Sequence, residues 1–317
     1  MAKILALSEL LIDFIQQKEI VGENPFYEAC PGGAPCNLLA MAQKLDNQTT
    51  FIGKIGKDSF GEQLETVISK IGINTSGLIK TSEKNTTVSI VSHDKTGDRS
   101  FSFFRGADAL LCEEEIDPRL FKNQDVFHFG TLSMTNDICK AATFKAIDIA
   151  KENHLIISCD PNLRANLWSN LDQAKEAFKE SFEVCNILKI SDNELRWFTG
   201  IYNLDSAIND LRSNYNIDLI LLTLGKDGSK AYYNDYYASA ETFLNIPCVD
   251  TTGAGDSFMG CALSEIMKIG IENLNNENLK EILLFSNAAA SLVAGKKGVI
   301  KVVPSFEEIQ TLKDSIF

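Results

Sequence analysis

The segment at residues 249–258, with the sequence VDTTGAGDSF, has the spacing that points most directly to a chemical function. Gly253 and Gly255 leave their backbone N–H groups unobstructed, so these groups can point at an anion. An apolar pattern typical of a helix follows and stops at Gly270, and the N-terminus of such a helix adds a positive dipole. Asp256 would repel a phosphate there, but it is well placed to take a proton from a hydroxyl group that attacks one.

Two familiar glycine motifs are excluded. The sequence contains no G-x-x-x-x-G-K-[ST] stretch, which a P-loop requires. A dinucleotide-binding fingerprint needs a third glycine three residues after Gly255, and that position is Phe258. The remaining alternative is a plain helix start after a tight turn, and the two aspartates at 250 and 256 favour a functional interpretation instead.

The composition limits the class of protein. A chain of 317 residues accommodates one large α/β domain with a decorating subdomain, and an apolar fraction of 44% is ample for its core. The net charge of −13 and a pI of about 4.8 argue against nucleic acids and anionic membrane surfaces as partners. A nucleotide pocket stays compatible with this charge, because a few local lysines and amides suffice to hold phosphates.

Cysteine and histidine usage disfavours a zinc site. The eight cysteines include no C-x-x-C pair, and the three histidines are far apart in the sequence. The N-terminal apolar run is cut by Glu9, and nothing approaches an 18-residue apolar span. We therefore expect a cytoplasmic protein with reduced thiols and no membrane partner.

Strand-like and helix-like segments alternate along most of the chain. The predicted strands are 3–7, 50–55, 126–129, 155–159, 187–190 and 218–223. The predicted helices are 34–45, 60–72, 137–153, 174–184 and 193–200, followed later by the helix after Asp256. This alternation predicts a parallel sheet with helices on both faces.

Two stretches depart from this alternation. Residues 14–30 and 86–104 alternate apolar and polar positions, with a turn signal at 95–98, and they predict antiparallel strands. We interpret them as a small β-lid over a pocket, formed by about 14–30 and 86–106. An ordinary extension of the sheet is the alternative. Because no repeat or long linker is visible, we expect residues 1–317 to form a single domain.

Polar residues follow three of the predicted strands directly, where α/β folds bind ligands. Residues 160–164 (DPNLR) combine the side chains that orient a hydroxylated, phosphorylated ligand. In residues 191–194 (SDNE), Glu194 can order water around Mg²⁺. Residues 223–228 (TLGKDG) suit the phosphates or ribose of a nucleotide. The structural alternatives are Asx turns with a solvent arginine, a helix cap at Ser191, and a hairpin turn.

Two further sites suit a small polar ligand. A glycine pair in residues 31–37 (PGGAPCN) opens a helix, and Asn37 offers both a donor and an acceptor. Asp13 ends an apolar run, where sugar hydroxyls would be suitable partners for a carboxylate that is costly to bury. A plain strand-to-helix turn and an exposed strand end are the respective alternatives.

These residues resemble a known family. Residues 32–37 (GGAPCN) and 250–258 (DTTGAGDSF) resemble the two signatures of the ribokinase-like PfkB carbohydrate kinases, and the resemblance runs over essentially the whole chain. Residues 51–61 (FIGKIGKDSFG), 104–108 (FRGAD) and 160–164 look like the fructokinase branch.

The resemblance implies a ribokinase-like fold of three α/β/α layers, with a central mostly parallel sheet and a small β-sheet lid. The implied reaction converts a sugar and ATP to a sugar phosphate and ADP, with fructose as the leading substrate. A kinase for 2-keto-3-deoxygluconate or a nucleoside is an alternative within the family. A non-catalytic sugar-binding regulator on the same fold is an alternative of a different class.

The resemblance also implies roles for individual residues. Asp256 would be the base, the backbone amides of Ala254, Gly255 and Asp256 would form an anion hole, and Gly253 would belong to the same catalytic turn. The sugar would contact Asp13, Gly32, Gly33, Asn37, Arg105 and Arg164. The nucleotide would contact Lys189, Ser191, Thr223, Gly225, Gly228 and Asn287. Mg²⁺ would accompany ATP and reach Glu194 through water, a monovalent cation such as K⁺ would lie near Asp250 and Thr252, and the lid would pair two copies into a homodimer.

Two positions depart from the family pattern. Ser8 stands where the family usually has a glycine, and its hydroxymethyl group is expected to crowd the sugar or shift the lid. Ser191 stands where the family often has an asparagine before its magnesium site, which fructokinase-like members tolerate.

Overall fold

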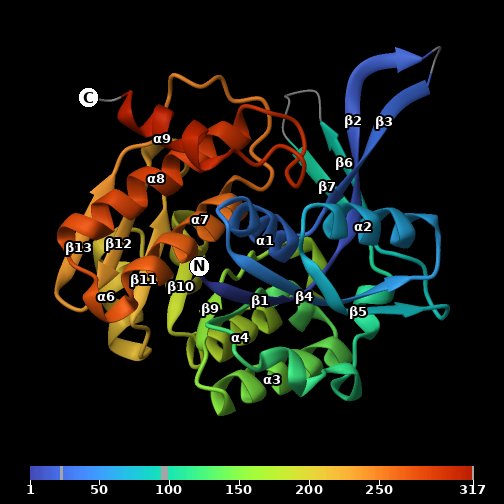
Figure 1. The fold of residues 1–317 in the computed structure, drawn as a ribbon, viewed down its shortest axis with the longest axis horizontal. Coiled ribbons are helices and arrows are strands. Elements are labelled where there is room, and N and C mark those ends of the chain that lie inside the picture. The colour runs from blue at the N-terminus through green and yellow to red at the C-terminus, as the bar shows by residue number, and fades with distance from the viewer. Residues whose placement is uncertain (22–23, 94–98, 316–317) are drawn as a thin grey trace.

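The computed structural model of the chain describes residues 1–21, 24–93 and 99–315. Within these residues, nine strands form a central sheet in the order β13-β12-β11-β10-β9-β8-β1-β4-β5 (Figure 1). Their bounds are β1 Lys3–Leu7, β4 Gln48–Gly56, β5 Asn74–Thr81, β8 Val126–Phe129, β9 Ile156–Cys159, β10 Ile187–Ser191, β11 Leu219–Thr223, β12 Ser229–Tyr233 and β13 Tyr236–Ala240. Neighbours from β5 to β11 are parallel, while β12 and β13 add an antiparallel edge. The predicted mostly parallel sheet is confirmed.

Helices cover both faces of this sheet and make three layers (Figure 1). One face carries α1 Ala34–Lys44, α2 Ser59–Lys70, α7 Ala254–Ile269 and α8 Asn276–Ala294, with α9 Phe306–Asp314 packed on α8. The other face carries α3 Asp137–Glu152, α4 Leu171–Phe182, α5 Asp192–Thr199 and α6 Leu204–Asn214. In β1, Ile4 and Ala6 enter the first core whereas Leu5 and Leu7 enter the second, as the two-residue period of a strand requires. In the described ranges, none of the helices has both the length and the apolar character to span a bilayer.

A second, four-stranded sheet, which we call the lid, stands beside the main sheet (Figure 1). It has the order β3-β2-β6-β7, with β2 Leu11–Val21, β3 Asn24–Gly32, β6 Val88–His93 and β7 Arg99–Phe104. Each of the two predicted stretches forms an antiparallel hairpin, which agrees with the prediction. The turn predicted at 95–98 lies outside the described residues.

The prediction did not extend to the contact between the two hairpins, where β2 and β6 are parallel with Ile12 opposite Val88. The reason is their origin in the main sheet. β2 follows β1 after three residues, β6 follows β5, and all pairings from β1 through β4 to β5 are parallel. Strands that continue in the direction of parallel strands meet each other in parallel.

Helices α1 and α7 cross at Gly260 and hold the two glycine motifs together. A Cβ atom on Gly260 would lie 2.5 Å from the Leu38 carbonyl oxygen and 3.0 Å from Met41 Cβ. Since α1 begins after Gly33 and α7 after Gly253, this close crossing fixes the relative position of their N-termini.

We predict that Gly260→Ala lowers the free energy of unfolding by about 1–3 kcal/mol, because the methyl group would overpack the crossing of α1 and α7. Urea denaturation monitored by circular dichroism measures this change. Helix propensity alone predicts the opposite sign, since alanine is favoured over glycine by about 1 kcal/mol inside a helix. An unchanged or raised midpoint would therefore contradict the close crossing.

Candidate active site

Two cavities lie on either side of the first turn of α7. The larger has a volume of about 420 Å³ and is lined in this region by Thr251, Ala254 and Gly255. The smaller, of about 50 Å³, is lined in this region by Thr252, Gly253 and Asp256. The glycine turn that the sequence singled out is therefore a thin wall between two potential ligand sites.

Close contacts explain the glycines of this turn. Gly253 has φ +72°, and a Cβ atom there would collide with the Val299 side chain. A Cβ atom on Gly255 would lie 2.9 Å from Lys189 Nζ. Lys189 therefore lies directly beside the turn, and its ammonium group adds positive charge where α7 begins.

Lys189 and Asp160 form a buried ion pair next to this turn. Lys189 Nζ donates to both carboxylate oxygens of Asp160, at 3.1 and 2.9 Å, and both side chains are buried. Burial raises the pKa of Asp160 to about 6, against the attraction of Lys189. Burial lowers the pKa of Lys189, but the surrounding carboxylates of Asp160, Glu194 and Asp256 outweigh this and raise it overall. Lys189 thus stays protonated at neutral pH.

Asp256 occupies the first turn of α7 and faces the smaller cavity. Asn37 Nδ2 on α1 donates to Asp256 Oδ2 at 2.8 Å, so the two signature motifs meet directly. Burial raises the pKa of Asp256, while hydrogen bonds from Asn37 and Asn162 and the charges of Lys189 and Arg164 oppose the rise. A carboxylate with a raised pKa is a stronger base, and general-base catalysis uses this property.

The smaller cavity is formed where the lid meets α1. Asp13 on β2 lines it and accepts a hydrogen bond from the Ser89 hydroxyl. Burial raises the pKa of Asp13 to about 6. A Cβ atom on Gly32 would lie 2.5 Å from Asp13 Oδ2, and one on Gly33 would lie 2.5 Å from the Glu9 carbonyl oxygen. The glycine pair therefore leaves room for backbone and carboxylate to approach each other.

Glu9 is a buried residue of this cavity that the sequence reasoning missed. Its Oε1 accepts from the backbone N–H of Ala34 at 2.8 Å, and its Oε2 accepts from the Ser8 hydroxyl. Ser8 is not among the described residues that line the cavity, and its hydroxyl is directed to Glu9. Glu9 is the second residue after β1, so the strand-end rule that identified Asp160 would have found it if extended by one residue.

The two predicted arginines are placed differently. Arg164 lines the smaller cavity, as the prediction requires. Arg105 is not among the described lining residues, because its guanidinium pairs with Asp108 at 2.8 Å and donates to the Leu132 carbonyl and the Thr135 hydroxyl. Arg105 thus fixes the wall behind the cavity in this conformation.

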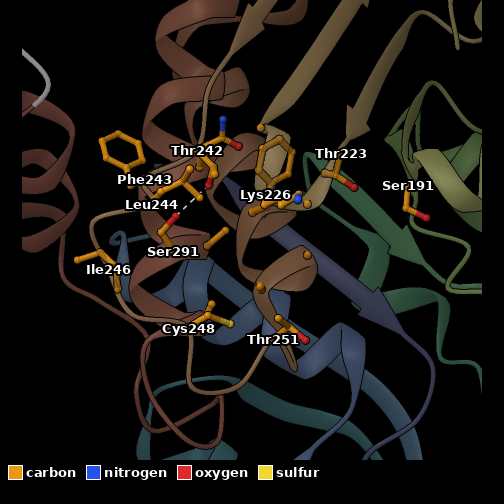
Figure 2. Close-up of a pocket in the computed structure, with 18 of the residues that line it drawn as sticks. Ser191, Thr223, Lys226, Thr242, Phe243, Leu244, Ile246, Cys248, Thr251 and Ser291 are labelled. Carbon is orange, nitrogen blue, oxygen red and sulfur yellow. Dashed lines mark hydrogen bonds between the residues drawn. The ribbon is translucent and has the colours of Figure 1, made fainter. Parts of the chain in front are cut away.

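The larger cavity gathers most of the residues predicted to contact a nucleotide (Figure 2). Its lining includes Ser191, Thr223, Gly225, Gly228 and Asn287. Lys189 is not among the described lining residues and lies behind the Gly255 turn.

An apolar wall of the larger cavity was not predicted. Phe243, Leu244, Ile246 and Cys248 line it, and the Thr242 and Ser291 hydroxyls bond each other at 3.1 Å (Figure 2). Such a wall suits a planar base. It lies between β13 and α7, in a segment without periodic pattern, so the sequence offered no signal for it.

Residues 223–228 form the hairpin turn that was one of the two interpretations, and their contact with a nucleotide stays a prediction. They form a hairpin turn between antiparallel β11 and β12, with Leu224 N–H donating to the Gly228 carbonyl at 2.8 Å, and they also line the larger cavity. Asn287 on α8 forms hydrogen bonds with the residues at the ends of β12 and β13 beside this turn. Its Nδ2 donates to the Ala240 and Glu241 carbonyls at 3.1 and 3.0 Å, and its Oδ1 accepts from the Ser229 hydroxyl at 2.9 Å.

The predicted metal-binding residues are used by the chain itself. Glu194 Oε1 accepts from Leu163 N–H at 2.9 Å, and its Oε2 accepts from Ser191 N–H at 3.0 Å in the predicted helix cap. Asp250 Oδ1 accepts from Thr252 N–H at 2.7 Å. The described residues contain no group of three or more His, Cys, Asp or Glu side chains that could hold a metal ion. This arrangement fits Mg²⁺ that arrives on phosphate oxygens, because Mg²⁺ keeps several waters and needs few protein ligands.

Comparison with known proteins identifies the class. The model of the pfkB family carbohydrate kinases matches residues 1–305. Probable fructokinase-2 of Arabidopsis thaliana is 34% identical over 306 residues, covering 95% of this chain and 93% of that protein. Fructokinase-2 of Solanum habrochaites is 34% identical over 313 residues, covering 98% and 95%. The crystal structure of fructokinase with bound ATP from Xylella fastidiosa superimposes with a TM-score of 0.90 at 27% identity, covering 99% of this chain and 98% of that one.

The chain belongs to the pfkB family of carbohydrate kinases. Its fold is ribokinase-like, and the enzyme is an ATP-dependent sugar kinase. Its sequence and structural relatives place it with the fructokinase branch of the family.

We predict that Lys189→Met lowers the free energy of unfolding by about 3–5 kcal/mol, because it leaves the Asp160 carboxylate buried without its partner. Urea denaturation at neutral pH measures the loss. Adding Asp160→Asn to this variant should recover part of it. As a matched control, Lys179→Met removes an exposed ion pair with Glu176 and should change stability by less than about 1 kcal/mol. Equal effects of the two lysine substitutions would contradict the structural role assigned to the buried pair.

Proposed function

We propose that this sugar kinase is a fructokinase, which transfers the γ-phosphate of ATP to the 6-hydroxyl group of fructose. The observation that carries the proposal is the pair of unequal cavities separated by the glycine turn, with the Asp256 carboxylate on the side of the smaller one. We assign the nucleotide to the larger cavity and the sugar to the smaller one. The names of the relatives in sequence and structure support fructose as the sugar.

In this proposal Asp256 accepts the proton of the sugar hydroxyl as its oxygen attacks the γ-phosphorus in line. The backbone N–H groups of Ala254, Gly255 and Asp256, at the N-terminus of α7, stabilise the negative charge of the transferring group. Lys189 strengthens this positive region from beside Gly255. Asp13, Gly33 and Asn37 hold the sugar, and closure of the lid excludes water that would hydrolyse ATP.

Metal ions enter the proposal through the nucleotide. Mg²⁺ bound to ATP neutralises charge on the phosphates. Glu194 would be linked to it through water, since both carboxylate oxygens already accept hydrogen bonds from the chain. K⁺ is proposed beside Asp250 and Thr252, which lie next to the anion hole.

The charges around the smaller cavity favour a neutral sugar over a sugar acid. Its described lining carries the carboxyl groups of Glu9, Asp13 and Asp256 against the guanidinium of Arg164. Arg105, which could have met a substrate carboxylate, is already paired with Asp108. The carboxylate of 2-keto-3-deoxygluconate would therefore be repelled.

The remaining proposals concern the whole enzyme. We propose that residues 1–317 form a single kinase domain and that it works in the cytoplasm, where thiols stay reduced, which the free cysteines of the described chain support. A homodimer through the lid is supported by exposed aromatic side chains on its strands, namely Phe26 on β3 and Phe104 on β7.

We expect purified enzyme with Mg-ATP to show its highest kcat/KM for fructose in a coupled ADP-release assay. The panel includes ribose, glucose, 2-keto-3-deoxygluconate and nucleosides, and the sugar acid should be turned over poorly because of the carboxyl groups around the cavity. Highest turnover with the sugar acid or a nucleoside would retain the kinase and reject fructose. Sugar binding without any turnover would favour the non-catalytic regulator.

We predict that Asp256→Asn keeps sugar binding but lowers kcat on the order of 10²–10⁴-fold, the usual range for loss of a general base. Steady-state kinetics and calorimetric binding of fructose measure the two effects separately. Asp13→Asn is the matched control, because it removes a carboxylate that only binds sugar and should act chiefly on KM. Near-normal turnover by Asp256→Asn would reject Asp256 as the base.

A further inference from the structure

A third, inner cavity adjoins Asp256 and has no role in the reaction as described so far. Its volume is about 10 Å³, and it shares Glu9, Asn162 and Asp256 with the smaller cavity. Its other polar side chains are Asp160 and His128, and His128 lies near the end of strand β8. The exposed fractions of these four titratable residues are 4% for Glu9, 3% for His128, 2% for Asp160 and 8% for Asp256.

His128 brings a polar atom to this cavity that the described chain does not satisfy. Its Nδ1 is hydrogen-bonded to the Ser158 hydroxyl at 2.8 Å, whereas its Nε2 has no hydrogen-bond partner among the described residues. Burial and the charge of Lys189 lower the pKa of His128 to about 3, so the ring is neutral and carries one N–H group. We assign that N–H group to Nε2, with the Ser158 hydroxyl donating to Nδ1.

The other polar groups of the cavity already have partners. Both carboxylate oxygens of Asp160 accept from Lys189, and both of Glu9 accept from Ala34 and Ser8. A carboxylate oxygen can accept further hydrogen bonds, but it has no proton to donate. A group that completes the hydrogen bonding of the cavity must therefore accept a hydrogen bond from His128 and donate hydrogen bonds to the carboxylates.

A single water molecule has this property. A cavity of about 10 Å³ is close to the smallest that can hold one water, and a buried water needs two to four polar partners. We propose that the inner cavity holds one resident water, which accepts a hydrogen bond from His128 Nε2–H and donates to the carboxylates of Asp256 and Glu9. This proposal rests on the proposed function insofar as Asp256 is the base, and it makes His128 a positioning residue that acts through the water.

The water would favour the ionised form of Asp256, since a hydrogen bond donated to a carboxylate stabilises its charge. It joins a set of charged and titratable groups that face Asp256 from the surrounding elements. That set consists of Lys189 on β10, Arg164 and Asp160 after β9, Asp13 on β2, Glu9 after β1 and His128 on β8. Without the water, burial would raise the pKa of Asp256 further, and less of the enzyme would be active at mildly acidic pH.

Gly130→Ala adds a methyl group to a residue that lines the inner cavity and removes no polar side chain, and we expect it to displace the water. Gly130 lines the cavity, and its φ of −124° is allowed for alanine. A Cβ atom there would lie 3.0 Å from the Asp160 carbonyl oxygen and, apart from chain neighbours, within 4 Å of no other heavy atom of the described residues. His128→Leu removes the same water by deleting its donor. Ser133→Ala is the matched control, because the Ser133 hydroxyl donates to the Gly130 carbonyl in the same turn but does not line the cavity.

The experiment measures the pKa of Asp256 in sugar-free enzyme from the ¹³C shift of its carboxyl carbon, assigned by its loss in Asp256→Asn. We expect Gly130→Ala and His128→Leu each to raise this pKa by about 0.5–1, the size expected for one lost hydrogen bond, with no change in Ser133→Ala. The acid limb of kcat/KM should move upward by the same amount. High-resolution crystal structures should show the water in the wild type and not in Gly130→Ala.

Absence of the water from the wild-type crystal structure, or an equal pKa of Asp256 in all of these variants, would overturn the inference and leave the proposed function intact. A water and a pKa shift in an enzyme that phosphorylates no sugar would reject the proposed function and leave the water site standing. A shift in His128→Leu alone would overturn the water and assign the effect to the histidine itself.

Discussion

The cost of burying an ionised carboxylate constrains the whole centre of this protein. Asp256 loses most of its hydration inside the fold, and this loss is unfavourable unless other groups replace the water. Asn37 donates a hydrogen bond to it, and Lys189 contributes a positive charge. Each of these groups needs its own support, since Lys189 is held by Asp160 and Asn37 by the start of α1 at Gly33. The N-terminal and C-terminal parts of the chain therefore meet at one side chain.

The strands of the parallel sheet were predicted from hydrophobic patterns, which are a local property of the sequence. Strands such as Leu219–Thr223 are buried on both faces and read as continuous apolar runs, which is why the parallel sheet was predictable. The antiparallel edge formed by β12 and β13 was visible only as one of two interpretations of the turn at 223–228. The parallel contact between β2 and β6 was not predictable. It depends on where the chain leaves the main sheet before each strand, and not on the composition of either strand.

The residues of the candidate site also include some that the sequence predicted and some that it did not. Residues at strand ends and in the two glycine motifs were predicted, and Asp256, Asn37 and Arg164 do lie together. The apolar wall around Phe243 was not, because hydrogen bonds from Asn287 on a helix some forty residues later hold it in place. Arg105 shows a different limit. The sequence gives the identity of this side chain, but its orientation depends on the ion pair between its guanidinium and Asp108.

The connection between the two sheets has a kinetic meaning. The backbone leaves β1, passes Ser8, Glu9 and Leu10, and becomes β2, so the link between the two sheets carries Glu9, a lining residue of the smaller cavity. If the lid closes over a bound sugar as proposed, its movement and the occupancy of the cavity share one conformational equilibrium. A sugar that fits poorly would leave the lid open more of the time, so discrimination between sugars is expressed in commitment to turnover as well as in affinity.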